Sequence, residues 1–205
     1  KVLDMYINYP IIVKEITAPC VCHEGDGFCI RAFPLEHTKT CVGYTLEEYQ
    51  RPGEFHPEKA RELKVPCGPL WAKLQAGCEV EAEDGSIVKP EQVLGPQRKG
   101  RKISYVTDTL YLDSIAKEVA NSDLLFCEGM FTKEFEEQAK EKKHMTSSQA
   151  AQIAKDANVK KMALIHYSPR YNDYDLKPLL TEAQSIFPET ILSKDRMTFE
   201  IPNED

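Results

Sequence analysis

The sequence predicts a mixed α/β (α+β) fold, and three observations predict it. Between residues 5 and 46, short apolar and β-branched runs alternate with turn signals, which is typical of antiparallel strands. After Gly100, strand patterns alternate with helical ones, as in a sheet backed by helices. Between them, Gly and Pro punctuate residues 50–97, which indicates an inserted arm. The 205 residues suit one ordinary domain, so we expect a single domain over 1–205 that includes this arm.

The first part is expected to form strands and a hairpin. Apolar runs recur from Met5 to Phe33, and Glu24-Gly25-Asp26-Gly27 supplies a turn. The run Cys29–Phe33 predicts a strand, and Val42–Leu46 predicts the start of the next one. His37 therefore lies in a loop between two strands.

The arm, about residues 50–97, is expected to contain two short helices and one hairpin. Helical patterns cover Pro57–Lys64 and Pro69–Gln75, and Asp84-Gly85 supplies a turn. Helices of this length bury little surface alone, so we expect the arm to be mobile unless it packs on a partner.

The second half is expected to alternate strands with helices. The predicted strands are Ile103–Val106, Asp123–Phe126, Met162–Ile165 and Met197–Ile201. The predicted helices are Tyr111–Ala120, Lys133–Lys142, Ser147–Asn158 and Leu176–Ser185. Thr146 offers an N-cap for the third helix.

Composition and charge narrow the function. Apolar residues make up 41% of the chain, yet no stretch approaches the length of a membrane span, so we expect a cytoplasmic protein with no membrane partner. A net charge of -7 argues against a surface that coats nucleic acid nonspecifically, so any nucleic-acid site must be local. Seven cysteines without a C-x-x-C pair suggest neither a zinc knuckle nor a disulfide framework.

Three residues at predicted strand ends are candidate metal ligands. They are His37, Asp108 and His166, and imidazole and carboxylate are the ligand types of catalytic zinc. Each taken singly is more often structural, and Asp108-Thr109 can instead cap the next helix. Together they favour a metal site, in which an aspartate can bridge two ions.

Two further residues are candidates for proton transfer. His144 precedes a predicted helix, whose N-terminus disfavours the protonated ring, and a neutral imidazole can shuttle protons. Glu128 follows a predicted strand and is the natural carboxylate to orient that ring. In the alternative interpretation, Glu128 is a solvated loop residue and His144 helps to cap the helix.

Basic residues suggest phosphate contacts. They gather at residues 98–102, which include Lys99 and Arg101, and at residues 140–143. We expect both groups to flank the edge with the metal ligands, although a solvated face explains residues 140–143 equally well. Arg170 lies four residues after His166, where a guanidinium can hold a phosphate through two parallel hydrogen bonds.

An ordered series of motifs resembles one family. The motifs are Pro34-Leu35-Glu36-His37, Arg51-Pro52-Gly53, Val65-Pro66-Cys67-Gly68-Pro69-Leu70, Lys99-Gly100-Arg101-Lys102, Thr107-Asp108-Thr109, His144-Met145-Thr146 and Ile165-His166-Tyr167-Ser168-Pro169-Arg170-Tyr171. In this order they resemble ribonuclease Z, the tRNA 3′-processing endonucleases of the metallo-β-lactamase superfamily. The resemblance implies the C-terminal part of an αββα sandwich with an inserted arm.

The resemblance also implies a mechanism and partners. It implies a zinc-dependent endoribonuclease that removes the 3′ trailer from precursor tRNA, with two Zn²⁺ ions and a homodimeric assembly. His37 would bind one zinc and His166 the other, with Asp108 between them. His144 and Glu128 would form the proton-transfer pair. The residues that would contact the tRNA are Arg170, Ser168, Gly68, Pro69, Lys99 and Arg101, the arm acting as a clamp.

The sequence departs from the family in several places, among them Thr107, where the family has a small residue before the aspartate, and Met145 in the family's His-Ser-Thr loop. Cys127-Glu128-Gly129-Met130 stands where the family has His-Glu-Ala-Thr, and His-x-His-x-Asp-His does not occur in the 205 residues. We therefore interpret the chain as the C-terminal portion, which needs the missing half to complete its metal site, binds zinc weakly and is inactive alone. The alternatives are a noncatalytic tRNA-binding module and another metallo-β-lactamase-fold hydrolase acting on small esters.

Overall fold

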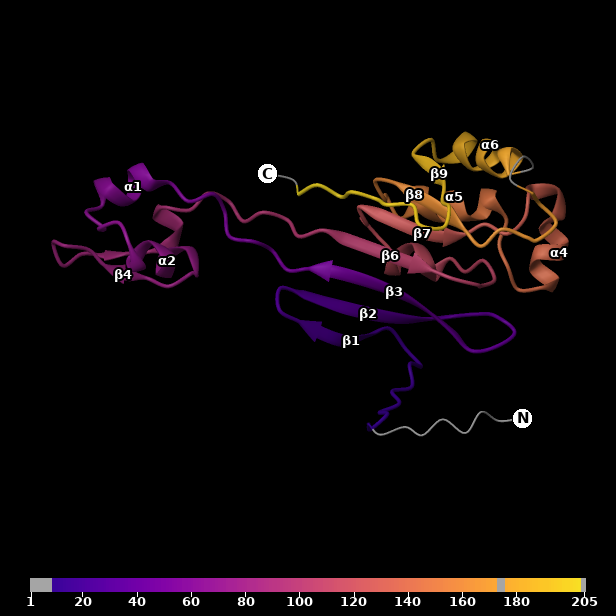
Figure 1. Cartoon of the computed structure of the whole chain (residues 1–205), viewed down its shortest axis with the longest axis horizontal. Coiled ribbons are helices and arrows are strands. Elements are labelled where there is room, and N and C mark those ends of the chain that lie inside the picture. The colour runs from indigo at the N-terminus through magenta and orange to yellow at the C-terminus, as the bar shows by residue number, and fades with distance from the viewer. Residues whose placement is uncertain (1–8, 173–175, 204–205) are drawn as a thin grey trace.

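The computed structural model describes residues 9–172 and 176–203. Its main element is a seven-stranded sheet with strand order β1-β2-β3-β6-β7-β8-β9. An arm projects from one end of this sheet, between β3 and β6 (Figure 1). The predicted mixed α/β class is confirmed.

The first three strands form the antiparallel side of the sheet. They are β1 (Cys20–Gly25), β2 (Phe28–Leu35) and β3 (Cys41–Glu48). Gly27 has a φ of +83°, the left-handed conformation that the β1–β2 turn requires and that glycine adopts without strain. The predicted hairpin and the two strands after it are confirmed.

The prediction of further strand before β1 is wrong where it can be checked. Residues 9–19 contain no strand, and Met5–Asn8 lie outside the described residues. The segment has no strand partner beyond β1, and Ile12 is 81% exposed. Among the described residues, the apolar segment 9–19 thus has no neighbouring strand with which to form a sheet.

The other side of the sheet is parallel. It consists of β6 (Lys102–Val106), β7 (Leu124–Glu128), β8 (Met162–Ile165) and β9 (Thr190–Leu192). The predicted strand at 197–201 is wrong, because this segment crosses a face of the sheet, where the ring of Phe199 meets Phe126 edge-on at 5.2 Å. The last strand is β9, which a crossover through α6 (Lys177–Ile186) places beside β8.

Helices pack on one face of the sheet and form the main core. They are α3 (Ser114–Glu118), the 3₁₀ turn η2 (Lys133–Phe135), α4 (Glu136–Glu141), α5 (Ser147–Asp156) and α6. Val106, Leu125 and Leu164 of the sheet share this core with Ile153 of α5. Thr146 caps α5 as predicted, since its Oγ1 accepts the N–H of Gln149.

The opposite face of the sheet has no helix over it among the described residues. Tyr44 of β3 and Tyr105 of β6 are cross-strand partners there, and they are 42% and 44% exposed. The described chain thus supplies one sheet layer and one helix layer, consistent with part of an αββα sandwich.

The arm has a hydrophobic core of its own. It contains α1 (Pro57–Glu62), α2 (Pro69–Gln75), β4 (Val80–Glu81), β5 (Ile87–Val88) and the 3₁₀ turn η1 (Pro90–Gln92). Its fully buried side chains include Leu74 and Val93, and Trp71 packs against them. The two short helices thus bury their apolar side chains against each other and against the hairpin.

We call residues 49–53 and 95–98 the neck, because the chain passes through them into and out of the arm. Arg51 and Arg98 exchange two backbone hydrogen bonds, of 2.8 and 2.9 Å. A Cβ at Gly53 would lie 2.0 Å from the carbonyl oxygen of Gly95, so the two strands approach too closely for any other residue.

At the base of the neck, Glu48 and Arg101 form a bidentate ion pair. Nε and Nη2 of Arg101 donate to the two carboxylate oxygens of Glu48. These bonds and the Arg101 backbone N–H lower the pKa of Glu48 from 4.5 to about 2. Arg101 also donates to the carbonyl oxygen of Ile201, which fastens the C-terminal segment to the neck.

The Glu48 pair predicts a pH-dependent stability. A carboxyl with a lowered pKa stabilises the fold fully above pH 4.5, and this contribution is lost as the pH falls toward about 2. Glu48→Gln should therefore lower the free energy of unfolding by about 1.5–3 kcal/mol at pH 7 and by much less at pH 3. Urea unfolding at both pH values measures this, with the exposed Glu54→Gln as the control. An equal loss at both pH values would contradict the assignment.

Candidate metal centre

Four strand ends bring the candidate residues to one edge of the sheet. β2 and β6 are each antiparallel to β3, so they point the same way, and β7 and β8 are parallel to β6. The C-terminal ends of β2, β6, β7 and β8 therefore share an edge. His37, Asp108 and His166 follow three of these strands, and Glu128 ends the fourth.

Three side chains converge at this edge. One ligand atom from each of His37, Asp108 and His144 lies within 4.8 Å of the others. Nε2 of His166 lies 3.5 Å from Oδ2 of Asp108. The ring of His144 lies 4.7 Å from that of His37 and 5.2 Å from that of His166, measured between centroids. The structure thus gathers His37, Asp108 and His166 as predicted, and it adds His144 to the same cluster.

The donor set fits a zinc centre. Imidazole nitrogens and a carboxylate are the ligands that zinc takes in catalytic sites, and these lie close enough to converge on one ion after small side-chain movements. The carboxylate of Asp108 lies within 4.8 Å of a ring nitrogen of His37 and 3.5 Å from Nε2 of His166, so a single carboxylate approaches both imidazoles.

The backbone fixes which nitrogen of His37 is available. Nδ1 lies 2.9 Å from the carbonyl oxygen of Lys143, which only accepts, so Nδ1 carries the proton. Nε2 is then the atom left to bind a metal, as is common for ligating histidines. The Lys143 ammonium forms an ion pair of 3.0 Å with Glu36, next to His37. Residues 140–143 therefore do flank the metal edge.

Glu128 contacts several groups next to the metal-ligand cluster. It is fully buried, so the interpretation of Glu128 as a solvated loop residue is wrong. Its carboxylate accepts the backbone N–H of Thr109 at 2.5 Å and of Met145 at 3.3 Å. Its two oxygens also lie 3.1 and 3.2 Å from Nδ1 of the buried His144, so Nε2 is the ring nitrogen of His144 that Glu128 does not hold.

The environment of His144 favours its protonated form. Burial alone would lower the pKa, but the hydrogen bond and charge of Glu128 and the charge of Asp108 outweigh it and raise the pKa of His144. An imidazole oriented in this way by a carboxylate is suited to general acid–base catalysis.

His166 is held in an unusual backbone conformation. Its φ is +59°, in the left-handed region that a residue with a Cβ seldom adopts. Such positions persist where the surroundings fix them, and they cluster at functional sites. His166 also lines a cavity of about 970 Å³ together with Asp195 and Tyr105.

Thr109 is a site residue that sequence reasoning missed. It does not cap a helix, because α3 begins only at Ser114 and carries no side-chain cap. Instead its N–H binds Glu128 and its Oγ1 accepts the N–H of Glu36, next to His37. Thr109 thus ties the His37 loop to the Asp108 loop. The only sequence signal was its position after Asp108.

Arg170 and Ser168 differ in what they can reach. Arg170 is exposed, stacks 4.3 Å from the ring centre of Phe135 and donates to Gln138. Ser168 is buried, and its hydroxyl oxygen faces the N–H of Arg170 at 3.5 Å. The geometry leaves Arg170 available to a substrate and gives Ser168 a role in holding the loop.

The other basic group lies far from the cluster. Arg101 precedes β6 and Asp108 follows it, so seven residues of extended chain, roughly 20 Å, separate them. The expectation that residues 98–102 flank the metal edge is therefore wrong. Lys99 and Arg101 lie at the base of the neck, and Gly68 and Pro69 begin α2 within the arm.

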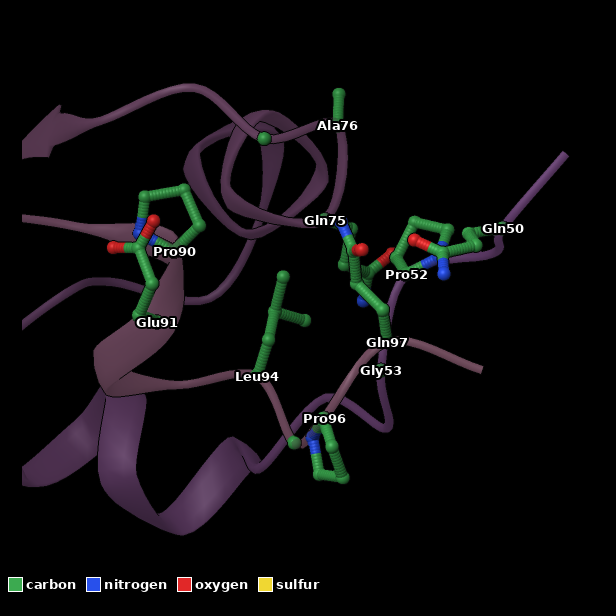
Figure 2. Close-up of a pocket in the computed structure, with 12 residues that line it drawn as sticks. Gln50, Pro52, Gly53, Gln75, Ala76, Pro90, Glu91, Leu94, Pro96 and Gln97 are labelled. Atoms are coloured by element: carbon green, nitrogen blue, oxygen red, sulfur yellow. The ribbon is translucent and has the colours of Figure 1, made fainter. Parts of the chain in front are cut away.

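A cavity of about 740 Å³ lies between the neck and the arm (Figure 2). Gln50, Gln75 and Gln97 line it with amide groups, and Leu94 and several prolines supply apolar walls. The cavity therefore lies next to Arg51, because Gln50 and Pro52, the residues before and after it, both line the cavity.

Comparisons with known proteins agree with this geometry. A family model described as the beta-lactamase superfamily domain matches residues 80–167. "Ribonuclease Z" of Treponema denticola is 65% identical over 100% of this chain and 67% of its own length. "Ribonuclease Z" of Haloferax volcanii is 41% identical over 97% of this chain and 62% of its own. The chain thus spans about two thirds of the length of these curated relatives.

Solved structures show the same fold at low sequence identity. The metallo-β-lactamase fold protein YhfI from Bacillus subtilis matches with a TM-score of 0.57 and 19% identity, over 92% of this chain and 55% of that one. The short form of human tRNase Z matches with a TM-score of 0.53 and 21% identity, over 90% of this chain and 47% of that one. In the described ranges, no helix has the length and apolar character needed to cross a bilayer.

Proposed function

The chain belongs to the ribonuclease Z family, and from this membership we propose that the full-length protein is a zinc-dependent endoribonuclease that removes the 3′ trailer from precursor tRNA. The observation that carries the proposal is the convergence of His37, Asp108, His144 and His166 at one edge of the sheet. Relatives named "Ribonuclease Z" over nearly the whole chain support the substrate class.

The ligands present would hold two zinc ions only in part. His37 and Asp108 would serve one ion, and Asp108 and His166 the other. When bound, zinc lowers the pKa of water and neutralises charge on the phosphate oxygens. Since a catalytic zinc takes three protein ligands, we expect the 205-residue chain by itself to bind zinc weakly and to cleave little.

The residues around the ligands would handle the proton. Glu128 holds Nδ1 of His144, so Nε2 faces the ligand cluster. A protonated His144 would donate to the 3′ oxygen of the RNA as the phosphodiester bond breaks. Arg170, stacked on Phe135, would hold a neighbouring phosphate with its remaining N–H groups.

The arm would hold the body of the tRNA. Its Gly68-Pro69 turn is exposed, and it projects from the sheet end opposite the metal edge (Figure 1). An arm directed away from the metals of its own chain supports a homodimer, in which it presents tRNA to the partner's site. We also assign the protein to the cytoplasm, where precursor tRNA would meet it.

Replacing the arm tests this assignment. Because Arg51 and Arg98 pair directly, an Asn-Gly turn can join them in place of residues 52–97. We expect tRNA affinity to fall about a hundredfold or more, since two linked contact regions become one. Hydrolysis of a small phosphodiester by the zinc-loaded variant should persist.

The same experiment separates the alternative functions. Undiminished tRNA affinity without the arm would show that the arm is not the clamp. A noncatalytic tRNA-binding module would bind tRNA without ever cleaving it, whatever metal is added. A hydrolase of small esters would cleave its substrate and ignore tRNA with or without the arm.

A further inference from the structure

One cationic side chain at the neck is left without a hydrogen-bond partner. In the described part of the chain, Nε and Nη2 of Arg51 are buried and have no acceptor within reach. Desolvating a cation without an acceptor is costly, and most buried polar groups in proteins are paired. The guanidinium of Arg51 therefore loses no hydrogen bond when it turns toward an external anion.

The other cations around Arg51 are engaged. Arg101 is held by both oxygens of Glu48. Nε of Arg98 donates to the carbonyl oxygen of Pro52 at 3.1 Å. Arg51 and Arg98 are also direct cross-strand partners, a position in which like charges repel each other, and Glu48 at the base of the neck is the carboxylate whose charge acts on Arg51.

The setting of Arg51 favours an extended anion. Lys99 and Arg101 continue the positive charge toward β6, although the chain as a whole carries a net charge of -7. The cavity beside the neck is lined by Gln50 and Pro52, the residues on either side of Arg51. A ligand that lies along the neck meets amide groups in this cavity, whose lining also includes Glu91, and it reaches the Arg51 guanidinium once that side chain turns outward. A guanidinium and amide groups together suit a sugar-phosphate backbone.

We propose that the neck is a second RNA contact, at which the guanidinium of Arg51 binds a backbone phosphodiester of the RNA that the arm holds. The contact rests on the proposed function for its ligand, and it adds a site between the arm and the catalytic domain. The contact does not distinguish one RNA sequence from another, because phosphate contacts position a nucleic acid and do not specify bases.

Salt-dependent binding tests the contact. Wild-type full-length protein and Arg51→Gln are titrated with mature tRNA, which has no trailer to cleave, at several salt concentrations. Arg51→Gln should bind about tenfold more weakly at low salt, and the slope of log K against log salt should shrink by about 0.7–0.9, as for one phosphate. Lys117→Gln removes one exposed charge on α3, away from the neck, and should change neither value.

A measurement on the wild-type protein keeps the test independent of folding. The Arg51 Nε–H resonance, assigned by its loss in Arg51→Lys, should shift when tRNA is added. Trp71 fluorescence reports whether the arm core stays folded in the variants. Two results would overturn the neck contact alone. One is an Arg51 resonance that does not shift although the wild-type protein binds tRNA, and the other is an unchanged salt slope in a folded Arg51→Gln variant. Wild-type protein that does not bind tRNA overturns the proposed function.

Discussion

Replacing Asp108 with asparagine in the full-length protein is expected to lower precursor-tRNA cleavage about a thousandfold or more. Asp108 lies close to both His37 and His166, and in the proposed site the amide that replaces it would carry no charge with which to hold two cations. Losing one metal forfeits several kcal/mol of charge stabilisation, and each 1.4 kcal/mol is about tenfold in rate. The measurements are kcat/KM at saturating zinc and the zinc bound per chain.

The control for this prediction is Asp156→Asn, which changes an exposed carboxylate on α5 and should alter neither value. Oδ1 of Asp108 accepts only the hydroxyl of Thr107 in the described structure, so the substitution should leave the fold intact. If Asp108→Asn retained both full zinc content and near-normal cleavage, Asp108 would not be the bridging ligand.

The second large effect is expected from the Glu128–His144 pair. His144→Ala should lower cleavage about 10²- to 10⁴-fold, the usual contribution of a positioned acid or base. Glu128→Gln should have a comparable effect on the rate. It should also lower the free energy of unfolding by about 1–3 kcal/mol, because a buried amide has one acceptor oxygen for donors that Glu128 serves with two.

Zinc content decides between the two roles that the geometry allows His144. If His144 transfers a proton, His144→Ala should keep its zinc and lose its rate. If zinc is lost in proportion to the rate, His144 is a ligand, in keeping with its place in the cluster of three ligand atoms. Gln149→Ala, at the first turn of α5, is a control for disturbance of the cap that follows His144, and it should lose stability without losing zinc.

The site could be predicted from the sequence because its residues follow strands. Local patterns located β2, β6, β7 and β8, and residues after strands of one direction meet at one edge. His37, Asp108 and His166 were found in this way. The burial of Glu128 and the proximity of His144 were harder to predict, because they depend on backbone donors from Thr109 and Met145 that only the folded chain brings together.

The errors arose where a pattern was local and its outcome depended on distant partners. The run at 197–201 has strand composition, but the parallel position beside β8 is occupied by β9, whose three residues give a weak signal. The basic residues 98–102 are close to Asp108 in sequence, yet β6 carries them to opposite ends of the sheet. The core of the arm could not be predicted from local patterns, because it joins residues from Ala60 to Val93.

The separate core of the arm has an evolutionary consequence. The chain enters and leaves the arm at two hydrogen-bonded residues, and the catalytic edge lies at the other end of the strands that carry them. Under the proposed function, substitutions that reshape the arm would alter which RNAs are retained while the chemistry is preserved. Descendants of one ancestor can diverge in substrate choice by exchanging, shortening or losing this single insertion.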